Sequence, residues 1–353
     1  MTPRTDRDLH AHALHDAWAA YGAPSPIVEV TEVSANVSTN RVYRLGLADH
    51  TAVIAKVSSY GSYFLFAEDH DRLYRMTHLL RGTRFEGLLA DVLGSDGRAF
   101  TWYDGSLWVA FYQEVQRREN LGRVLEDREV ENLGHEIAAL HLACAAIAPQ
   151  IPPMSNTVKG DAIHLLDLLE SPFASRNFEI PPEHIGILHR HTHEFLLELE
   201  RIRYDEWPKL PILVDWNLGN FSVQTQPDGT FRLFSRWDYD WFRLEPRLLD
   251  FYFLSRVSSR TGDKTQWTYS WHTLVEPRFF RFLAAYHEVF PLEERDILFL
   301  PEVYRFFILN YVIREGAKFF RPDLCAQFRR QAAQVYLPSF EQLDITPLLS
   351  IIR

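Results

Sequence analysis

The sequence of 353 residues contains only two cysteines and no long uninterrupted apolar run. Cys144 and Cys325 are too few for a disulfide framework, which favours a reducing compartment, and neither lies in a Cys or His cluster typical of zinc sites. No stretch reaches the ~18 apolar residues of a membrane-spanning helix, and the first fifteen residues lack the apolar core of a signal peptide. We therefore predict a cytoplasmic protein with no membrane partner.

The chain also lacks an excess of positive charge. It has 37 Lys and Arg residues against 47 Asp and Glu residues, a formal net charge of −10. Such a chain has no overall electrostatic attraction for nucleic acid or anionic membranes, so we predict no nucleic-acid partner. The length suits one large domain or two lobes, and the composition leaves a monomer and a homodimer equally open.

The first third of the chain is predicted to be rich in β-strands. Residues 27–33 alternate apolar and polar side chains, the period-two pattern of a half-buried strand. Two more strands are predicted at 41–45 and 52–57, and a helix is predicted at 66–80. Strands at 99–103 and 107–112, with a further hairpin turn near residues 95–97, complete this part.

Beyond Val115 the periodicity becomes mainly helical. Helices are predicted at 129–148, 161–170 and 182–202, and everything after residue 246 is predicted to be mostly helical. Strands at 221–223 and 231–234 flank a Pro-Asp-Gly turn, so a hairpin is embedded among the helices. The predicted fold class is α+β, with a small sheet-rich lobe at 1–115 and a large mainly helical lobe at 116–353.

Three polar residues and one lysine have the spacing that phosphoryl transfer needs. Asp215 and Asn220 are five residues apart, and Asp238 follows the predicted hairpin. Lys56 ends an apolar strand in the preceding lobe. Kinases use a carboxylate facing the acceptor hydroxyl, an Asn and an Asp that hold metal ions, and a lysine on the nucleotide phosphates. This combination favours catalysis over the common use of Asp and Asn as turn caps.

The motif extends beyond these positions. The segment Asp238-Tyr239-Asp240-Trp241 is followed twelve residues after Asp238 by Asp250. With the helix that ends in Leu140-His141 and the segment 282–286, it resembles the aminoglycoside phosphotransferase and choline kinase-like family. The resemblance covers nearly the whole chain and implies a two-lobed protein-kinase-like fold. The lobe at 1–115 would then cover the nucleotide, and the lobe at 116–353 would carry catalysis and the acceptor.

The resemblance implies a small-molecule kinase that uses ATP and Mg²⁺, and it assigns roles residue by residue. Asp215 would orient or deprotonate the acceptor hydroxyl, Asn220 and Asp238 would hold Mg²⁺, and Lys56 would contact the nucleotide phosphates. Asp250 would brace the catalytic loop. GTP in place of ATP stays open.

The remaining nucleotide contacts are also implied by the resemblance. Glu68, at the start of the predicted helix, would pair with Lys56, with Asp69 and Asp71 as rivals. The other predicted contacts are polar donors to the phosphates and the backbone that meets the adenine: Ser38, Asn40, Tyr112, Gln113 and Glu114.

Two departures from the family pattern motivate an alternative function. Leu213-Val214 stands where the family usually has His-Gly before the Asp, and residues 34–40 contain no glycine. A catalytically weak nucleotide-binding pseudokinase or scaffold is the alternative hypothesis. The kinase is favoured by four intact residues: Lys56, Asp215, Asn220 and Asp238.

The acceptor is predicted to be a small molecule, and a cationic one is favoured by acidic and aromatic side chains near the motif. Asp240 and Glu245 supply negative charge, and Trp216 or Trp241 could offer a face to a cationic amine. An amino-sugar or amino-alcohol fits, as does a sugar or a homoserine-like acceptor. The histidines at 184, 189, 191 and 193 are predicted to form a solvated helix face.

Overall fold

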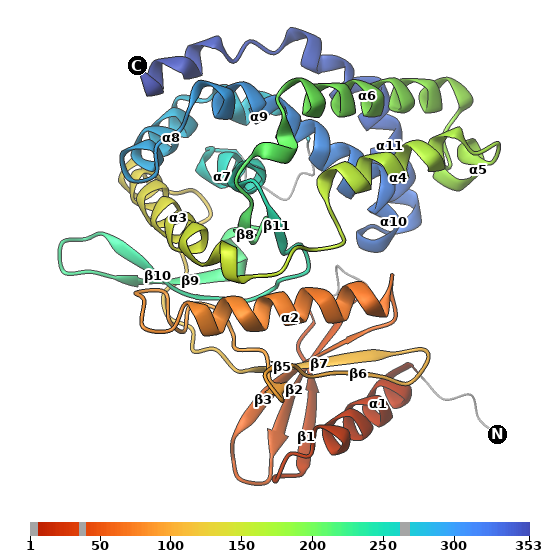
Figure 1. Ribbon diagram of the computed structural model, residues 1–353, viewed down its shortest axis with the longest axis vertical. Coiled ribbons are helices and arrows are strands. Elements are labelled where there is room, and N and C mark those ends of the chain that lie inside the picture. The colour runs from red at the N-terminus through yellow and green to blue at the C-terminus, as the bar shows by residue number, and fades with distance from the viewer. Residues whose placement is uncertain (1–5, 35–39, 262–268) are drawn as a thin grey trace. The chain divides into compact units, whose positions relative to one another are not determined.

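The computed structural model describes residues 6–34, 40–261 and 269–353. The chain divides into two compact units, each treated separately below. Unit 1 comprises Met1–Gln116 with Ser235–Trp237, and unit 2 comprises Arg117–Phe234 with Asp238–Arg353. Figure 1 labels their helices and strands.

Unit 1 is built on a five-stranded antiparallel sheet in the order β1-β2-β3-β7-β6. The predicted strands and the predicted helix are present, with ends shifted by a few residues. The expected strand at 99–103 is split, because residue 100 bonds to Leu93 between two short strands. The elements are α1 (Asp6–Tyr21), β1 (Ile27–Glu32), β2 (Arg41–Leu47), β3 (Ala52–Ser58), α2 (Tyr63–Leu79), β4 (Gly94–Ser95), β5 (Arg98–Ala99), β6 (Thr101–Tyr103) and β7 (Trp108–Gln113).

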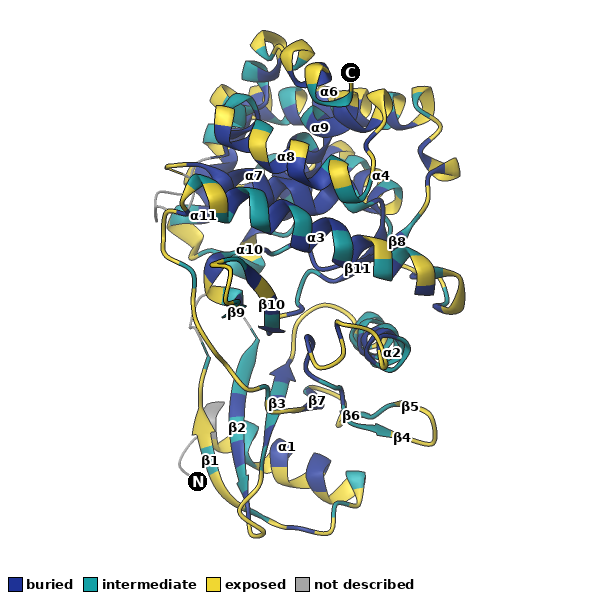
Figure 2. Cartoon of the chain, turned by 90° about the vertical axis from the view of Figure 1, so that its left-hand side faces the viewer, coloured by how far each residue is buried: buried dark blue, intermediate teal, exposed yellow. Residues whose placement is uncertain are grey.

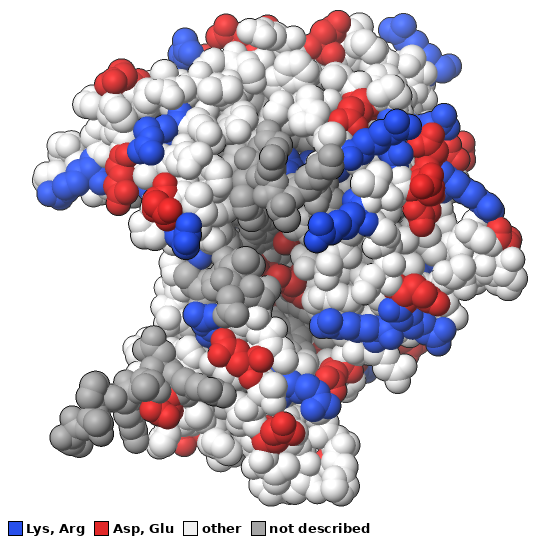
Figure 3. Space-filling view, turned by 180° about the vertical axis from the view of Figure 1, so that it is seen from behind, with Lys and Arg blue, Asp and Glu red and all other residues white. Residues whose placement is uncertain are grey.

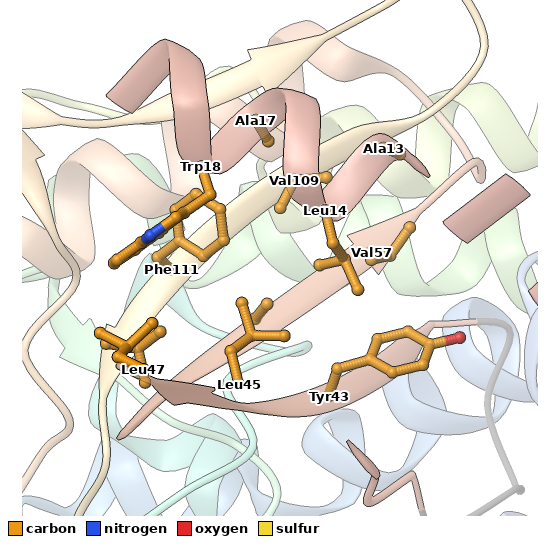
Figure 4. Close-up of a cluster of buried hydrophobic side chains, with 12 residues drawn as sticks. Ala13, Leu14, Ala17, Trp18, Tyr43, Leu45, Leu47, Val57, Val109 and Phe111 are labelled. Carbon is orange, nitrogen blue, oxygen red and sulfur yellow. The ribbon is translucent and has the colours of Figure 1, made fainter. Parts of the chain in front are cut away.

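Helix α1 covers one face of this sheet and was not predicted from the sequence. Ala13, Leu14, Ala17 and Trp18 are buried against alternate residues of β2, β3 and β7 (Figure 4). These four form one stripe at helical spacing, a signal obscured by the charged and histidine residues around it. The indole N–H of Trp18 donates to the carbonyl of Ser25 at 2.8 Å, which ties the end of α1 to the chain that begins β1.

The opposite face of the sheet carries polar side chains. In β2 and β3 most even-numbered residues are half-buried, whereas most odd-numbered ones are buried under α1. Helix α2 is linked to this second face at β7, because the hydroxyl of Tyr112 and Nε2 of His70 lie 2.5 Å apart. The period-two alternation of the strands thus separates an apolar face from a face that includes Arg44, Ile54 and Lys56.

Unit 2 is mainly helical, with two short strand pairs, β9-β10 and β8-β11. Helix α7 is buried along its whole length (Figure 2). The embedded hairpin is present as predicted, and the helices at 129–148, 161–170 and 182–202 are confirmed. The elements are α3 (Asp127–Ile147), α4 (Val158–Glu170), α5 (Ala174–Phe178), α6 (Pro182–Arg201), β8 (Leu210–Ile212), β9 (Phe221–Thr225), β10 (Phe231–Arg236), β11 (Arg243–Glu245), α7 (Phe251–Ser258), α8 (Pro277–Val289), α9 (Glu294–Phe307), α10 (Gly316–Phe319) and α11 (Pro322–Gln331), with a π-helical segment, η6, at Ile308–Arg314.

Helices α3 and α8 pack closely in unit 2. A Cβ atom placed on Gly134 of α3 would lie 2.6 Å from the carbonyl oxygen of Phe282 in α8. Only glycine allows this approach, which explains why the two segments noted in the sequence, around 133–141 and 282–286, belong to one contact.

Two surface observations complete the description. Among the described residues, no helix is both long and apolar enough to cross a membrane. On the face drawn in Figure 3, basic and acidic side chains are interspersed.

Candidate active site

The loop after β8 is held by one buried carboxylate. Asp250 is fully buried, and its Oδ1 accepts the backbone N–H of Val214 at 2.7 Å. Its Oδ2 accepts the indole N–H of Trp216 at 2.6 Å. Asp215 lies between these two anchored residues, so Asp250 fixes the loop on both sides of it. The predicted bracing role of Asp250 is confirmed.

A second layer supports Asp250. His141, buried in α3, places Nε2 2.9 Å from Asp250 Oδ2 and Nδ1 2.8 Å from the hydroxyl of Tyr286. Burial raises the pKa of Tyr286, so its hydroxyl stays protonated and can donate to Nδ1. The other ring nitrogen of His141 then carries the proton and donates to the carboxylate. The Asp250 carboxylate thus receives three donors, which offsets the cost of burying its charge.

Val214 has an unusual backbone at this point. Its φ is +58°, in the left-handed region that β-branched residues rarely adopt. Strand β8 ends at Ile212, and the chain then turns sharply, with the Asp215 N–H bonded to the Leu213 carbonyl at 2.7 Å. The bond to Asp250 and the burial of the Val214 side chain hold this strained conformation in place.

Asp215 itself is half-buried. Its Oδ1 accepts hydrogen bonds from the backbone N–H of Asn217 at 3.2 Å and from the Asn217 side chain at 2.6 Å. The turn contact that Asp and Asn commonly make is therefore present, and it orients the carboxylate.

Asn220 and Asp238 lie on either side of the β9-β10 hairpin. Asn220 ends a short 3₁₀ turn, Leu218–Asn220, and its N–H donates to the carbonyl of Asn217 at 2.9 Å. Asp238 follows β10 by two residues, is exposed and has a left-handed backbone (φ 69°). Its Oδ1 accepts the N–H of Asp240 at 3.4 Å. The short loop joins Asp215 to Asn220, and the hairpin separates Asn220 from Asp238.

Lys56 and Glu68 belong to unit 1. Lys56 lies on β3, on the sheet face opposite α1, between Val42 of β2 and Ala110 of β7. Glu68 was expected at the start of a helix, but α2 begins at Tyr63, which puts Glu68 in its second turn. Glu68 forms an ion pair with Arg72 at 3.4 Å. Its predicted pairing with Lys56 stays a prediction.

The two rivals of Glu68 lie in the same helix, α2. Asp71 is shared by Arg72 and Arg75, at 2.9 and 3.0 Å. Asp69 also lies in α2.

The predicted base-contacting segment ends β7. The N–H of Gln113 donates to the carbonyl of Asp91 at 2.9 Å, so this amide is already bonded within unit 1. The Glu114 carboxylate accepts two hydrogen bonds from Arg44. Asn40 directly precedes β2, and Ser38 lies outside the described residues.

Two expectations about the acceptor side were wrong. Trp216 is completely buried, because its ring fills the space behind the loop, and it lines no acceptor surface. Glu245 is also completely buried; its carboxylate accepts the Val158 N–H at 2.7 Å and the Tyr204 hydroxyl at 3.1 Å. It serves as an internal anchor.

The expected solvated histidine face was also wrong in part. His184 and His191 are buried on the inner side of α6, His189 is half-buried, and His193 is exposed. The helical period of 3.6 residues places positions 184 and 191, seven apart, on the same inward-facing stripe as Leu188.

Sequence reasoning missed a buried charge network in unit 2. Asp161 of α4 receives Arg243 Nη2 and Arg314 Nη2, each at 2.6 Å, and Arg243 Nε donates to the Tyr311 hydroxyl at 3.0 Å. The same Tyr311 ring stacks on Trp241 at 4.4 Å. The network links η6 to the segment that follows Asp238. Its members are separated by 68 to 153 residues, so no local pattern points to it.

Comparisons with known proteins give the fold. No protein-family model matches the sequence, and no curated protein matches it. Among solved structures, the chain resembles the amicoumacin kinase hAmiN in complex with AMP-PNP and Ca²⁺ (TM-score 0.64, 14% identity, 98% of this chain and 100% of that chain).

Two further structures resemble it: the GDP and kanamycin complex of APH(2″)-IIia (TM-score 0.59, 13% identity, 92% and 97%) and an ethanolamine kinase of Plasmodium vivax (TM-score 0.60, 11% identity, 96% and 91%). The predicted protein-kinase-like fold, of the kind found in aminoglycoside phosphotransferases and choline kinase-like proteins, is thereby confirmed.

Proposed function

We propose that the protein is a phosphotransferase that uses ATP and Mg²⁺ to phosphorylate a hydroxyl group of a small molecule. The observation that carries this proposal is the anchoring of Asp215. Asp250 binds the chain directly before and directly after it, so the Asp215 carboxylate sits on a loop of fixed shape within a protein-kinase-like fold. A catalytic carboxylate needs such positioning, because misplacement of a reacting group by about 1 Å can cost on the order of 100-fold in rate.

The remaining roles follow from residue chemistry. Lys56 would contact the nucleotide phosphates, and Asp215 would accept the proton of the acceptor hydroxyl or orient it. Asn220 and Asp238 offer amide and carboxylate oxygens, the hard ligands that Mg²⁺ prefers. Within the described residues, no cluster of three or more His, Cys, Asp or Glu side chains forms a metal cage. That fits Mg²⁺, which takes one or two protein ligands and completes its shell with phosphate oxygens and water. When bound, the ion would neutralise charge on the transferred phosphate.

The segment after Asp238 supports a cationic acceptor. Asp240 and Trp241 are half-buried, so both keep some access to solvent. The Trp241 ring is held by Tyr311, Phe253 and Phe319, at centroid distances of 4.4, 5.4 and 5.3 Å. A carboxylate next to a rigid indole suits an ammonium group. We propose an amino-sugar or an amino-alcohol as the acceptor class.

The test is ATP turnover across a panel of amino-sugars, amino-alcohols and plain sugars. We expect Asp215→Ala to lower the turnover of the best acceptor by about 10²–10⁴-fold, because the acceptor hydroxyl loses its base. Asp323→Asn, at an exposed ion pair with Arg321, is the matched control and should keep full activity. Retained activity in the Asp215→Ala protein would remove Asp215 from the catalytic role.

A nucleotide-binding pseudokinase is the second candidate function. The strained backbone of Val214, where the family usually has glycine, is the observation that favours it. A thermal-shift measurement with ATP and Mg²⁺ separates the candidates when combined with the panel. Binding with turnover supports the kinase, and binding without turnover of any acceptor supports the pseudokinase.

A further inference from the structure

Two rows of side chains cross the open face of the unit 1 sheet, which is the face opposite α1. The strand register places Val42, Lys56 and Ala110 side by side in one row. The next row contains Thr31, Arg44, Ile54 and Tyr112. The rows are two residues apart along each strand, or about 7 Å.

Among the described residues, one of the two rows next to Lys56 is more open than the other. On the other side, Ser58 and Trp108 are paired across β3 and β7, and both are buried. The aromatic side chains of α2 pack over Trp108, with the Phe66 and Tyr63 rings at 6.3 and 6.4 Å. In the row of Arg44, by contrast, the Arg44 side chain is 43% exposed. A nucleotide with its phosphates at Lys56 would therefore extend its base along this more exposed row, beside Arg44 and Ile54.

The guanidinium group of Arg44 is held in a fixed plane. Its Nε donates to Glu114 Oε1 at 2.7 Å, and its Nη2 donates to Glu114 Oε2 at 3.0 Å. Two parallel bonds of this kind define the orientation of both planar groups. Glu114 also neutralises the charge of Arg44, so the pair offers a flat face more than a net attraction for phosphate. Guanidinium planes stack on nucleobases in many complexes.

We propose that Arg44, clamped by Glu114, is a stacking platform for the purine base of the nucleotide. This inference rests on the proposed function, because it assumes that Lys56 binds the phosphates. Stacking involves the face of the base and not its hydrogen-bonding edge, so the platform contributes equally to the binding of ATP and GTP. It therefore sets affinity for a purine nucleotide without choosing between the two.

The experiment is calorimetric titration of the full chain with three Mg²⁺ complexes: ATP, GTP and tripolyphosphate, which has no base. We expect Arg44→Ala to lower the affinity for ATP and for GTP by about tenfold each and to leave the affinity for tripolyphosphate unchanged. Arg44→Lys should not restore binding, because an ammonium group lacks the planar face. Lys56→Ala should lower the affinity for all three ligands.

Two further variants test the clamp and the specificity of the effect. Glu114→Ala should lower the affinity for ATP less than Arg44→Ala does. The double variant should bind ATP with the same affinity as Arg44→Ala alone, since Glu114 acts only through Arg44. Arg81→Ala removes another exposed arginine of unit 1, which is paired with Asp91 at 3.3 Å. This variant should bind all three ligands with the affinity of the wild type.

Each alternative result has a distinct meaning. If Arg44→Ala weakens ATP and tripolyphosphate by the same factor, Arg44 acts through charge and the platform is wrong. If it binds ATP like the wild type, the platform is wrong while the proposed function stands. If the wild type binds neither nucleotide, the proposed function and the platform both fail.

Discussion

At the scale of single residues, one carboxylate determines the shape of the candidate catalytic loop. Asp250 accepts the Val214 N–H and the Trp216 indole N–H, and it contacts His141 from behind. Holding a valine in the left-handed region costs roughly 1–2 kcal/mol. The three contacts to a buried charge are each stronger than an ordinary hydrogen bond and offset this cost. The loop therefore keeps its form with Leu213-Val214 in place of His-Gly.

Trp216→Phe tests this network. The substitution keeps an aromatic ring in the buried space but removes the donor to Asp250 together with part of the indole ring. We expect the unfolding free energy to fall by about 2 kcal/mol in urea denaturation.

Trp108→Phe is the matched control for this change. Trp108 is also buried, and its indole N–H has no hydrogen-bond partner among the described residues. The Trp108→Phe protein should therefore lose only the packing of the larger ring. Equal losses in the two variants would mean that the bond to Asp250 contributes nothing to stability.

At the scale of elements, the packing of α3 against α8 depends on a missing side chain. The Cβ that Gly134 lacks would meet the Phe282 carbonyl at 2.6 Å and the Ala285 Cβ at 3.0 Å. Both contacts come from α8, and the first involves backbone, which cannot rotate away. His141 lies two turns further along α3, and Tyr286 lies on α8. The spacing of the two helices thus sets the hydrogen bond that supports Asp250.

Gly134→Ala is expected to destabilise the protein by about 1–3 kcal/mol, because α3 and α8 must move apart. Gly186→Ala in α6 is the matched control: its Cβ would enter open space, and alanine favours helix by about 1 kcal/mol over glycine. Chemical denaturation should move the two midpoints in opposite directions. A Gly134→Ala protein as stable as the wild type would show that the helices separate at no cost.

At the scale of the whole molecule, a buried acid makes stability depend on pH. Glu302 in α9 is largely buried, and its ion pair with Arg305 is 3.5 Å long. Burial raises the pKa of Glu302 from its ordinary value near 4.5 to about 7, and the charge of Arg305 offsets only part of this. The folded protein then binds this proton more tightly than the unfolded chain does. The tighter binding of the proton at Glu302 stabilises the folded protein fully below pH 4.5, and this stabilisation is lost as the pH rises to about 7.

Glu302→Gln should therefore raise the unfolding free energy at pH 7.5 by up to about 3 kcal/mol and should have little effect at pH 4.5. Urea denaturation of both proteins across this pH range measures the difference. Glu288→Gln, at an exposed carboxylate near His135, is the control and should leave the pH profile unchanged. A Glu302→Gln protein that keeps the wild-type slope between pH 4.5 and 7 would contradict the raised pKa.

The predictable part of the fold is the part written in local patterns. Alternation in residues 27–57 predicted β1, β2 and β3, and helical spacing predicted α2, α3 and α6. Helix α1 was missed because its apolar stripe is short, and β11 was missed because three residues carry no period. The order of Lys56, Asp215, Asn220 and Asp238 predicted a kinase fold, which the structural comparisons confirm.

The sequence by itself determined which residues alternate, which helices form and where the polar motif lies along the chain, because these depend on neighbours within a few positions. Tertiary structure alone decided that Trp216 and Glu245 are buried anchors, that Val214 turns left-handed, and that Arg44 meets Glu114 seventy residues away. Burial and hydrogen-bond partners are properties of contacts between distant segments. A residue type and its spacing do not specify them, since the same Asp or Trp serves equally well in a site or behind it.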